Sequence, residues 1–334
     1  MKVLVCPLNW GLGHATRCVP LIQKLAADGH EVVLASDGSP LVFLKLQFPS
    51  LRYIEFPSYS FRYSDGKSQI LAMICSIPNI LSGIFKEHLF LQKLLKTEHF
   101  DRVISDNRFG LWSKKTHSTY ITHQLMIKMP RGLKCIEPVI WLLHRAFINN
   151  YDKCLIPDYE GKDNLSGDLA HKYPLPKNAK FIGPLSRFQE IKFVPNNEFE
   201  VIGLVSGPEP QRTIFENYLT ERFMNEGRKA LIICGQPQKE IIKREVGNLH
   251  FFSHSPDKEL AEYLVGAEII ISRSGYSTIM DLNALKCLEK AEFIPTPGQT
   301  EQEYLCSLHA FKSKNQEPKI MSQEPRPIIN IFKE

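Results

Sequence analysis

The chain is 334 residues long, with 43% hydrophobic and 23% charged residues and a formal net charge of +5. This length predicts two domains of roughly 150 residues each, and the composition is typical of a folded globular protein rather than a disordered or fibrous one. The small excess of positive charge does not indicate a nucleic-acid partner.

Cysteine usage and the shortness of the apolar runs predict a cytoplasmic protein. The eight cysteines are scattered and form no C-x-x-C pair, which favours reduced thiols over disulfides or a zinc site. The first residues lack the pattern of a signal peptide, and no uninterrupted apolar run approaches the roughly 18 residues that span a bilayer. We expect a cytoplasmic protein that could also lie peripherally on the inner face of the membrane.

The first half of the chain alternates short apolar runs with helical patterns. Residues 15–30 are predicted to form a helix between two such runs. Apolar runs without strict alternation are typical of strands buried on both faces, and strands separated by helices indicate βαβ units of a parallel sheet. The predicted strands are residues 2–6, 31–36, 100–107, 118–124 and 151–158.

A proline-bearing stretch, residues 183–200, predicts a linker, because the alternation restarts after it. Strands are predicted at 201–207, 229–235, 249–256 and 268–275, and helices at 211–226 and 257–267. We therefore expect an α/β fold of two doubly wound, Rossmann-like domains that face a cleft. The first domain is expected to span residues 1–185 and the second residues 200–307, with a linker at 186–199 between them. A tail from 308 to 334 is expected to cross back to the first domain.

Two apolar-rich helical patterns, residues 70–95 and 128–148, interrupt the alternation in the first half. The second carries the basic residues Lys128, Arg131, Lys134 and Arg145. This composition is typical of core-facing helices with solvated basic faces, and it also suits a helix that lies on an anionic membrane surface.

The stretch LNWGLGHATR follows the first predicted strand and could be a dinucleotide-binding turn. Gly11 and Gly13 match the fingerprint G-x-G-x-x-G, and Asp37 would be the ribose-binding acid. Thr16 occupies the third glycine position, and a histidine after the second glycine is unusual for a pyrophosphate site. The dinucleotide interpretation is therefore weak.

Two stretches of the second half, residues 271–282 and 294–305, each combine a strand end, a turn of small residues and a helix start. The first would present backbone N–H groups and hydroxyls to a phosphate at a helix N-terminus. Asp281 would lie on the first turn of that helix, either binding a ribose diol or forming a capping box with Thr278. A second capping box, Thr300 with Glu303, would leave Gln302 free to face a ligand.

The segments SRSGYSTIMDL and PTPGQTEQEYL resemble the nucleotide-sugar signature of GT-B glycosyltransferases. The similarity is to family 28, the group of the bacterial transferase that adds N-acetylglucosamine to undecaprenyl-linked muramyl peptide. GLGHATR resembles that group's acceptor loop, and with GPEPQR and PGQTEQ it resembles an uncharacterised bacterial and archaeal set. The resemblance implies a GT-B fold with the acceptor bound by the first domain and the donor by the second.

The resemblance also implies donor-binding residues. Asp281 would hold the ribose hydroxyls, and Gln302 would bind the sugar hydroxyls. In the loop 206–212, Gly207 would let the backbone approach the diphosphate and Arg212 would balance its charge. The remaining residues are Ser274, Gly275, Ser277 and Thr278 for the diphosphate, with Gln299, Glu301 and Glu303 beside Gln302. His254 would lie where the family contacts the nucleobase through its backbone.

The same resemblance gives His14 the role of general base, taking the proton from the acceptor hydroxyl. A helix dipole would keep a histidine at this position neutral, as a base must be. Asp106, at a predicted strand end, would orient His14 as an aspartate does in plant relatives, unless it is only a polar strand-end residue. The acceptor-side candidates are Gly11, Gly13, Asn107, Arg108 and His123. Arg17 is expected to be a cation on the face of the helix with a structural role.

The resemblance implies an inverting glycosyltransferase that uses a UDP-sugar and no cofactor. The chain has no D-x-D motif, so we expect the transfer to be independent of a metal. The acceptor would be a glycan or a lipid-linked saccharide of the cell envelope. Three alternatives stay open: a nucleotide-sugar 2-epimerase of the same fold, a non-catalytic nucleotide-sugar-binding subunit docked on a membrane, and an oxidoreductase that binds NAD through Gly11, Gly13 and Asp37.

Overall fold

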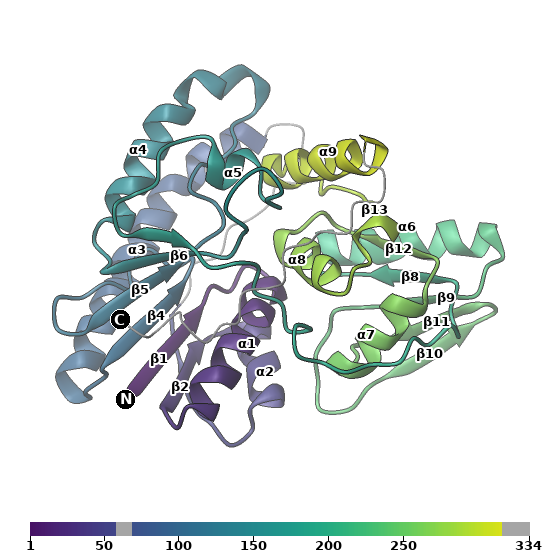
Figure 1. Ribbon diagram of the computed structural model, residues 1–334, viewed down its shortest axis with the longest axis horizontal. Coiled ribbons are helices and arrows are strands. Elements are labelled where there is room, and N and C mark those ends of the chain that lie inside the picture. The colour runs from purple at the N-terminus through teal and green to yellow at the C-terminus, as the bar shows by residue number, and fades with distance from the viewer. Residues whose placement is uncertain (58–68, 316–334) are drawn as a thin grey trace. The chain divides into compact units, whose positions relative to one another are not determined.

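The computed structural model describes residues 1–57 and 69–315, which form two compact units (Figure 1). The first unit contains Met1–Trp10 and Leu21–Gly183. The second contains Gly11–Pro20 and the described residues from Pro184 onward. Each unit is built around one β-sheet.

The sheet of the first unit has seven strands, all paired in parallel, in the order β3-β2-β1-β4-β5-β6-β7. Its central strands are buried, as their apolar runs predict. The bounds are β1 Lys2–Pro7, β2 Glu31–Ser36, β3 Arg52–Glu55, β4 Arg102–Asp106, β5 His117–Ile121, β6 Lys153–Ile156 and β7 Ala179–Phe181. Leu91, on a long helix, packs on this sheet against Leu4, Val33 and Val103.

The helices between these strands are α1 Leu12–Ala27, α2 Gly38–Gln47, α3 Gln69–Thr97, α4 Glu137–Ile148 and α5 Asp168–His171. The prediction of one helix over 128–148 is wrong, because Arg131–Ile136 forms a 3-10 helix, η1, before α4 begins. Pro138 explains the break: it has no N–H to donate and fits only in the first turn of an α-helix. Within the described ranges, no helix has both the length and the apolar character needed to cross a bilayer.

The sheet of the second unit has six strands in the order β10-β11-β9-β8-β12-β13, and only β10 is antiparallel to its neighbour. The strands are β8 Val201–Leu204, β9 Ala230–Ile233, β10 Lys243–Val246, β11 Leu249–Phe252, β12 Ile269–Ser272 and β13 Ala291–Phe293. The helices are α6 Gln211–Glu226, α7 Asp257–Gly266, α8 Tyr276–Ala284, η2 Leu288–Lys290 and α9 Thr300–Asn315. The predicted helices at 211–226 and 257–267 are confirmed.

The units divide the chain between Gly183 and Pro184. Gly11–Pro20, expected in the first domain, group with the second unit, and α1 belongs partly to each. At the other end α9 continues through residue 307, where we expected the second domain to end. Residues 316–334, most of the tail expected to cross back, lie outside the described residues.

Candidate functional site

Both sheets have a point at which the strand order reverses. In the second unit α6 carries the chain from β8 to β9, whereas β12 pairs with β8 on its other side. In the first unit α1 leads from β1 to β2, whereas β4 pairs on the other side of β1. Ligands of open α/β sheets bind at the carboxyl ends of the strands at such a point. The loops after β8 and β12, and those after β1 and β4, are therefore the candidate sites.

The loop after β12 leads into the N-terminus of α8. Gly275 is the N-cap, so Ser277 and Thr278 lie in the first turn. The first N–H groups of a helix have no acceptor within it and favour an anion. The Ser274 hydroxyl donates to the backbone carbonyl of Gln302, and the Ser277 hydroxyl donates to the backbone carbonyl of Gly13, both at 2.8 Å. A phosphate here would therefore be met mainly by backbone N–H groups.

The loop after β13 is joined to this site. α9 begins at Thr300, so Thr300 is its first helical residue, and the capping box predicted with Glu303 is wrong. Glu303 instead accepts the N–H of Gly298 at 3.1 Å. Gln302 Oε1 accepts the N–H of Thr296 at 2.8 Å, so half of its amide is used within the loop. Gln299 and Glu301 lie at the same end of α9.

Asp281 is buried in the second turn of α8, not in the first turn, and it forms no capping box, because α8 has no side-chain cap. Ser186 Oγ donates to its carboxylate at 2.7 Å, and Arg187 Nε lies 3.4 Å from the other oxygen. Burial raises the pKa of Asp281 to about 6, although the Arg187 charge opposes the shift. The carboxylate ties α8 to the segment that enters the second unit.

The loop after β8 contains Gly207, whose φ of +106° favours glycine. Arg212 follows on the first turn of α6. Its guanidinium donates to Glu209 and, at 2.8 Å, to Glu216. Two carboxylates therefore already balance the charge that we expected Arg212 to offer to a diphosphate.

The glycine-rich loop after β1 packs on the α8 N-terminus within the second unit. A Cβ on Gly13 would lie 2.9 Å from Ser277 Oγ, so a larger residue there would require the Ser277 side chain to shift, and Gly11 has a φ of +123°. His14 follows in the first turn of α1 and is partly buried. Arg17 Nη2 donates to His14 Nδ1 at 3.0 Å, since a guanidinium can only donate. Arg17 is only 2% exposed, so the cation that we expected on the face of the helix is buried.

The acceptor-side candidates after β4 and β5 are largely buried. Asp106 is fully buried at the end of β4, and its carbonyl accepts the N–H of Leu8, where the glycine-rich loop leaves β1. Asn107 has a φ of +58°, and its side-chain oxygen accepts the hydroxyls of Tyr120 and Thr122. His123 is 6% exposed.

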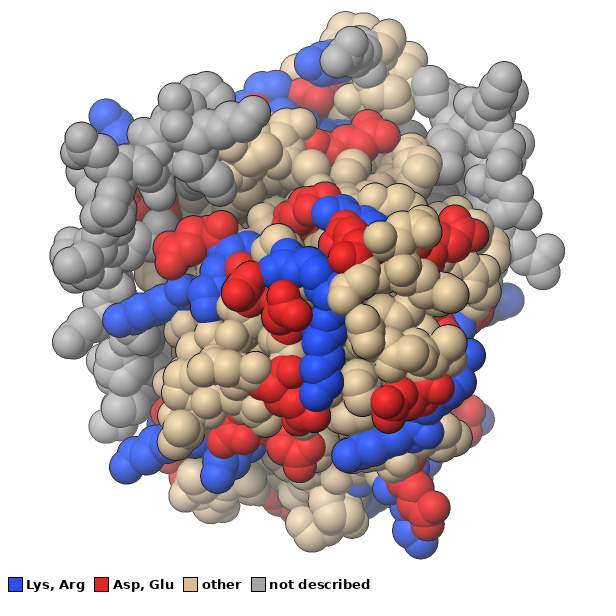
Figure 2. Space-filling model, turned by 90° about the vertical axis from the view of Figure 1, so that its right-hand side faces the viewer, with Lys and Arg blue, Asp and Glu red and all other residues tan. Residues whose placement is uncertain are grey.

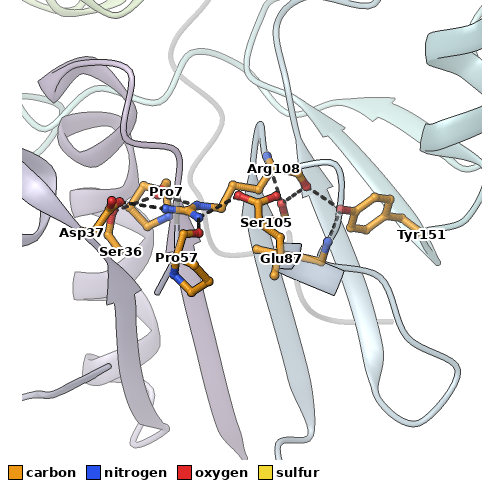
Figure 3. Close-up of polar contacts among 9 residues, drawn as sticks. Pro7, Ser36, Asp37, Pro57, Glu87, Ser105, Arg108 and Tyr151 are labelled. Carbon is orange, nitrogen blue, oxygen red and sulfur yellow. Dashed lines mark hydrogen bonds and ion pairs between the residues drawn. The ribbon is translucent and has the colours of Figure 1, made fainter. Parts of the chain in front are cut away.

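Arg108 is buried in the first unit, and Figure 3 shows its contacts with Pro7, Pro57 and Glu87. Its side chain is fully buried and donates to the carbonyls of Pro7 and Pro57, each at 3.0 Å, and to Glu87 at 2.8 Å. Asp37 lies 3.4 Å from the same guanidinium. Arg108 thus ties together the ends of β1, β2 and β3, and the Asp37 carboxylate expected to bind a dinucleotide ribose forms an ion pair instead.

Sequence reasoning missed Ser186, Arg187 and Arg273, whose guanidinium donates to the carbonyls of Ile294 and Pro295 in the loop after β13. Ser186 and Arg187 lie in the expected linker, and no local pattern pairs them with Asp281, which is 95 positions from Ser186. Arg273 stands inside the SRSG motif, which could have drawn attention to it.

Charged side chains of the second unit largely pair with each other. Arg222 contacts Glu292 at 2.6 Å, and Lys229 contacts Glu198 at 3.3 Å. Figure 2 shows one face of the molecule, on which acidic and basic side chains are interspersed. Such a face does not present the large field of one sign that attracts nucleic acid.

No protein-family model matches the chain. Two curated relatives, from Methanosarcina mazei and Methanosarcina acetivorans, each carry the name uncharacterized glycosyltransferase. Each is 24% identical to this chain, and each alignment covers 91% of this chain and 82% of the relative.

Solved structures resemble the chain over nearly its whole length. The glycotransferase of kitacinnamycin has a TM-score of 0.55 at 15% identity, covering 95% of this chain and 90% of its own. SnogD from Streptomyces nogalater has a TM-score of 0.54 at 14% identity, covering 98% and 97%. The Streptomyces sp. SF2575 glycosyltransferase complexed with thymidine diphosphate has a TM-score of 0.54 at 12% identity, covering 93% and 86%.

Identities this low establish the fold alone, and they confirm the prediction of a GT-B fold with two Rossmann-like domains. Membership of family 28 stays a prediction. Together with the named relatives, the fold supports the assignment of this chain as an enzyme, a glycosyltransferase of the GT-B fold.

Proposed function

We propose that this chain transfers a hexose or an N-acetylhexosamine from a nucleotide sugar to an acceptor hydroxyl. The observation that carries the proposal is the pair of hydrogen-bonded loops after β12 and β13. One ends in the N-terminus of α8, which favours an anion, and the other presents Gln302; Ser274 and Gln302 hold the two together. A diphosphate and its sugar require these two kinds of group side by side.

On the donor side, the diphosphate would bind the first-turn N–H groups of α8, with Gly207 allowing close approach of the loop after β8. The amide nitrogen of Gln302 would donate to a sugar hydroxyl. To bind the ribose, Asp281 would exchange its bond with Ser186 for one with a ribose hydroxyl. UDP is the proposed carrier, and TDP is the second candidate because one structural neighbour was solved with thymidine diphosphate.

The proposed chemistry is inversion without a metal. The acceptor oxygen attacks the anomeric carbon, the bond from that carbon to the diphosphate oxygen breaks, and His14 takes the hydroxyl proton. The helix dipole of α8 would stabilise the departing diphosphate. For Nε2 of neutral His14 to accept the proton, Nδ1 must carry the ring proton. Arg17 must therefore release Nδ1 when the acceptor binds.

A transfer assay tests the proposal. Radiolabelled UDP-glucose and UDP-N-acetylglucosamine are incubated with membrane lipid or with soluble oligosaccharides, and the label in the acceptor is counted. His14→Ala should lower kcat by about a hundredfold or more and leave the Kd for UDP within about twofold. His99→Ala, an exposed histidine paired with Asp101, is the control.

Three outcomes, of this assay or of the corresponding binding measurements with NAD and nucleotide sugars, would contradict parts of the proposal. Full turnover by His14→Ala would remove His14 as the base. Formation of the 2-epimer without any acceptor would favour an epimerase. Binding of NAD without binding of any nucleotide sugar would overturn the function.

We also propose that the acceptor is lipid-linked and that the first unit meets an anionic bilayer. On α4, Val139, Leu142 and Leu143 are each more than half exposed, and on α3 Phe85 and Leu89 are as well. Exposed lysines, Lys93 and Lys96, follow on α3. Apolar helix faces beside lysines favour anionic lipid surfaces. The expected basic face is reduced, however, because Lys128 pairs with Asp168 at 2.7 Å and Arg145 lies over Trp141.

Co-sedimentation with vesicles tests this surface. Phe85→Ser with Leu89→Ser should weaken binding to vesicles containing phosphatidylglycerol by about tenfold, since two large apolar side chains lose their burial in the lipid. Met224→Ser, which changes a residue 60% exposed on α6, is the control. Equal binding by the double variant and the wild type, or no binding by the wild type, would contradict the proposal.

A further inference from the structure

Arg273 links the two proposed donor loops. It follows β12 and directly precedes Ser274, and its side chain is 6% exposed. Its Nη1 donates to the carbonyls of Ile294 and Pro295, at 3.3 and 2.8 Å. These carbonyls begin the loop whose next N–H, that of Thr296, is held by Gln302. Arg273 therefore fixes the start of the loop that presents Gln302.

The charge of Arg273 has no carboxylate partner among the described residues. Its guanidinium carbon lies 4.2 Å from the centre of the Phe215 ring, and its Nε is buried without an acceptor in the described part of the chain. Three of the other buried or partly buried arginines, by contrast, each contact two carboxylates. They are Arg108 with Glu87 and Asp37, Arg187 with Asp257 and Asp281, and Arg212 with Glu209 and Glu216.

A buried cation without an anion is costly, and an arginine does not escape the cost by losing its proton. Carbonyl dipoles and an aromatic face lower this cost without cancelling the charge. The uncompensated charge stands two residues before the N-cap of α8, the position at which an anion is favoured. The anion that would balance Arg273 is therefore one that binds this end of α8.

We propose that Arg273 is a positioning residue for the diphosphate of the donor. It holds the loops after β12 and β13 together, and its fixed charge adds to that of the α8 N-terminus, a task that the already paired Arg212 does not perform. This inference rests on the proposed function and assigns the electrostatic part of that same site. It concerns nucleoside diphosphates as a class, because neither interaction depends on the base.

The test compares a charged ligand with its neutral counterpart. The Kd values of UDP and of uridine are measured by calorimetry for the wild type, Arg273→Met and Arg273→Lys. Arg273→Met should weaken UDP binding by about tenfold or more while uridine binding changes less than about twofold. Arg273→Lys keeps the charge and should keep the ratio of the two Kd values within about threefold of the wild type. Arg222→Met, which removes a paired surface cation of the same unit, should change neither ligand.

Different results would contradict the proposed function and the role of Arg273. The Kd of TDP is measured for the wild type in the same way, and if the wild type binds neither UDP nor TDP, the proposed function is overturned. If the wild type binds UDP but Arg273→Met weakens UDP and uridine equally, or weakens neither, the role of Arg273 is overturned and the donor site stands. Should Arg273→Met not fold, the Arg273→Lys variant decides the question. A tenfold increase in the ratio of its UDP Kd to its uridine Kd, relative to the wild type, would contradict a role that depends on charge.

Discussion

Glu87 is a carboxyl group buried in the first unit beside the guanidinium of Arg108. One of its oxygens accepts from Arg108 (Figure 3). The other has no hydrogen-bond partner among the described residues. Burial raises the pKa of Glu87 to about 7, with the Arg108 charge opposing the shift. Asp37 shares the same guanidinium, so one cation faces two carboxylates.

This shift predicts a pH dependence of stability. Because the pKa of Glu87 is higher in the folded chain than in the unfolded one, the folded chain holds an extra proton between pH 4.5 and about 7. The stability gained from that proton is complete below the unfolded pKa and is lost as the pH rises through the folded pKa. The side chain of Glu87→Gln stays neutral at both pH values. Between pH 5 and pH 8 the wild type should therefore lose on the order of 2 kcal/mol more unfolding free energy than this variant.

Urea unfolding at the two pH values measures this change. Glu98→Gln is the matched control, because the pairing of Glu98 with Arg52 lowers its pKa and it stays ionised in the folded chain at both pH values. Its variant should lose stability about equally at pH 5 and pH 8. If Glu87→Gln shows the same pH dependence as the wild type, Glu87 does not titrate as argued.

At the scale of elements, α3 is held tightly against the loop after β4. A Cβ on Gly110 would lie 2.4 Å from the Ile84 carbonyl oxygen and 2.8 Å from Glu87 Cβ. His88 accordingly bonds the Gly110 carbonyl at 3.1 Å, and its ring contacts Trp112. The position of the loop that follows Asp106 therefore depends on α3.

Gly110→Ala should lower the free energy of unfolding by about 1–3 kcal/mol, because the clashing atom is backbone and cannot turn away. Gly132→Ala is the control, since no described atom lies within 4 Å of a Cβ placed there. Urea unfolding compares the two variants. Equal stabilities for both would mean that α3 can shift away from the loop at little cost.

The elements also show what the sequence could predict. The buried strands β1, β2, β4, β8 and β12 carry apolar runs, the helices α6 and α7 lie between such strands, and all were predicted. The strands β3 and β10 were missed because they are short and mostly exposed, so no apolar run marks them. At the site, the positions of the glycine-rich and serine-rich loops follow from local patterns. The burial of Arg108 and the bond from Ser186 to Asp281 do not, because both depend on partners far along the chain.

At the scale of the whole molecule, each unit has its own doubly wound sheet and its own reversal of strand order. All proposed donor contacts, from Gly207 to Gln302, belong to the second unit, as does the glycine-rich loop with His14. The chain therefore brings the proposed base and the donor loops into one unit through residues that lie more than 200 positions apart, as the bond from Ser277 to Gly13 shows.

This division predicts how a nucleotide stabilises the chain. A ligand that binds only the folded state adds about 2.7 kcal/mol at a concentration of 100 times its Kd. UDP or TDP should therefore raise the unfolding temperature measured by calorimetry, and NAD should not. The rise should fall on the transition of the second unit. Gly266→Ala identifies that transition, because its Cβ would lie 2.0 Å from the Asn196 carbonyl oxygen and should lower the unfolding temperature of the second unit. Gly110→Ala should lower the unfolding temperature of the first unit in the same way. A nucleotide shift confined to the transition lowered by Gly110→Ala would place the nucleotide in the first unit and contradict the donor site.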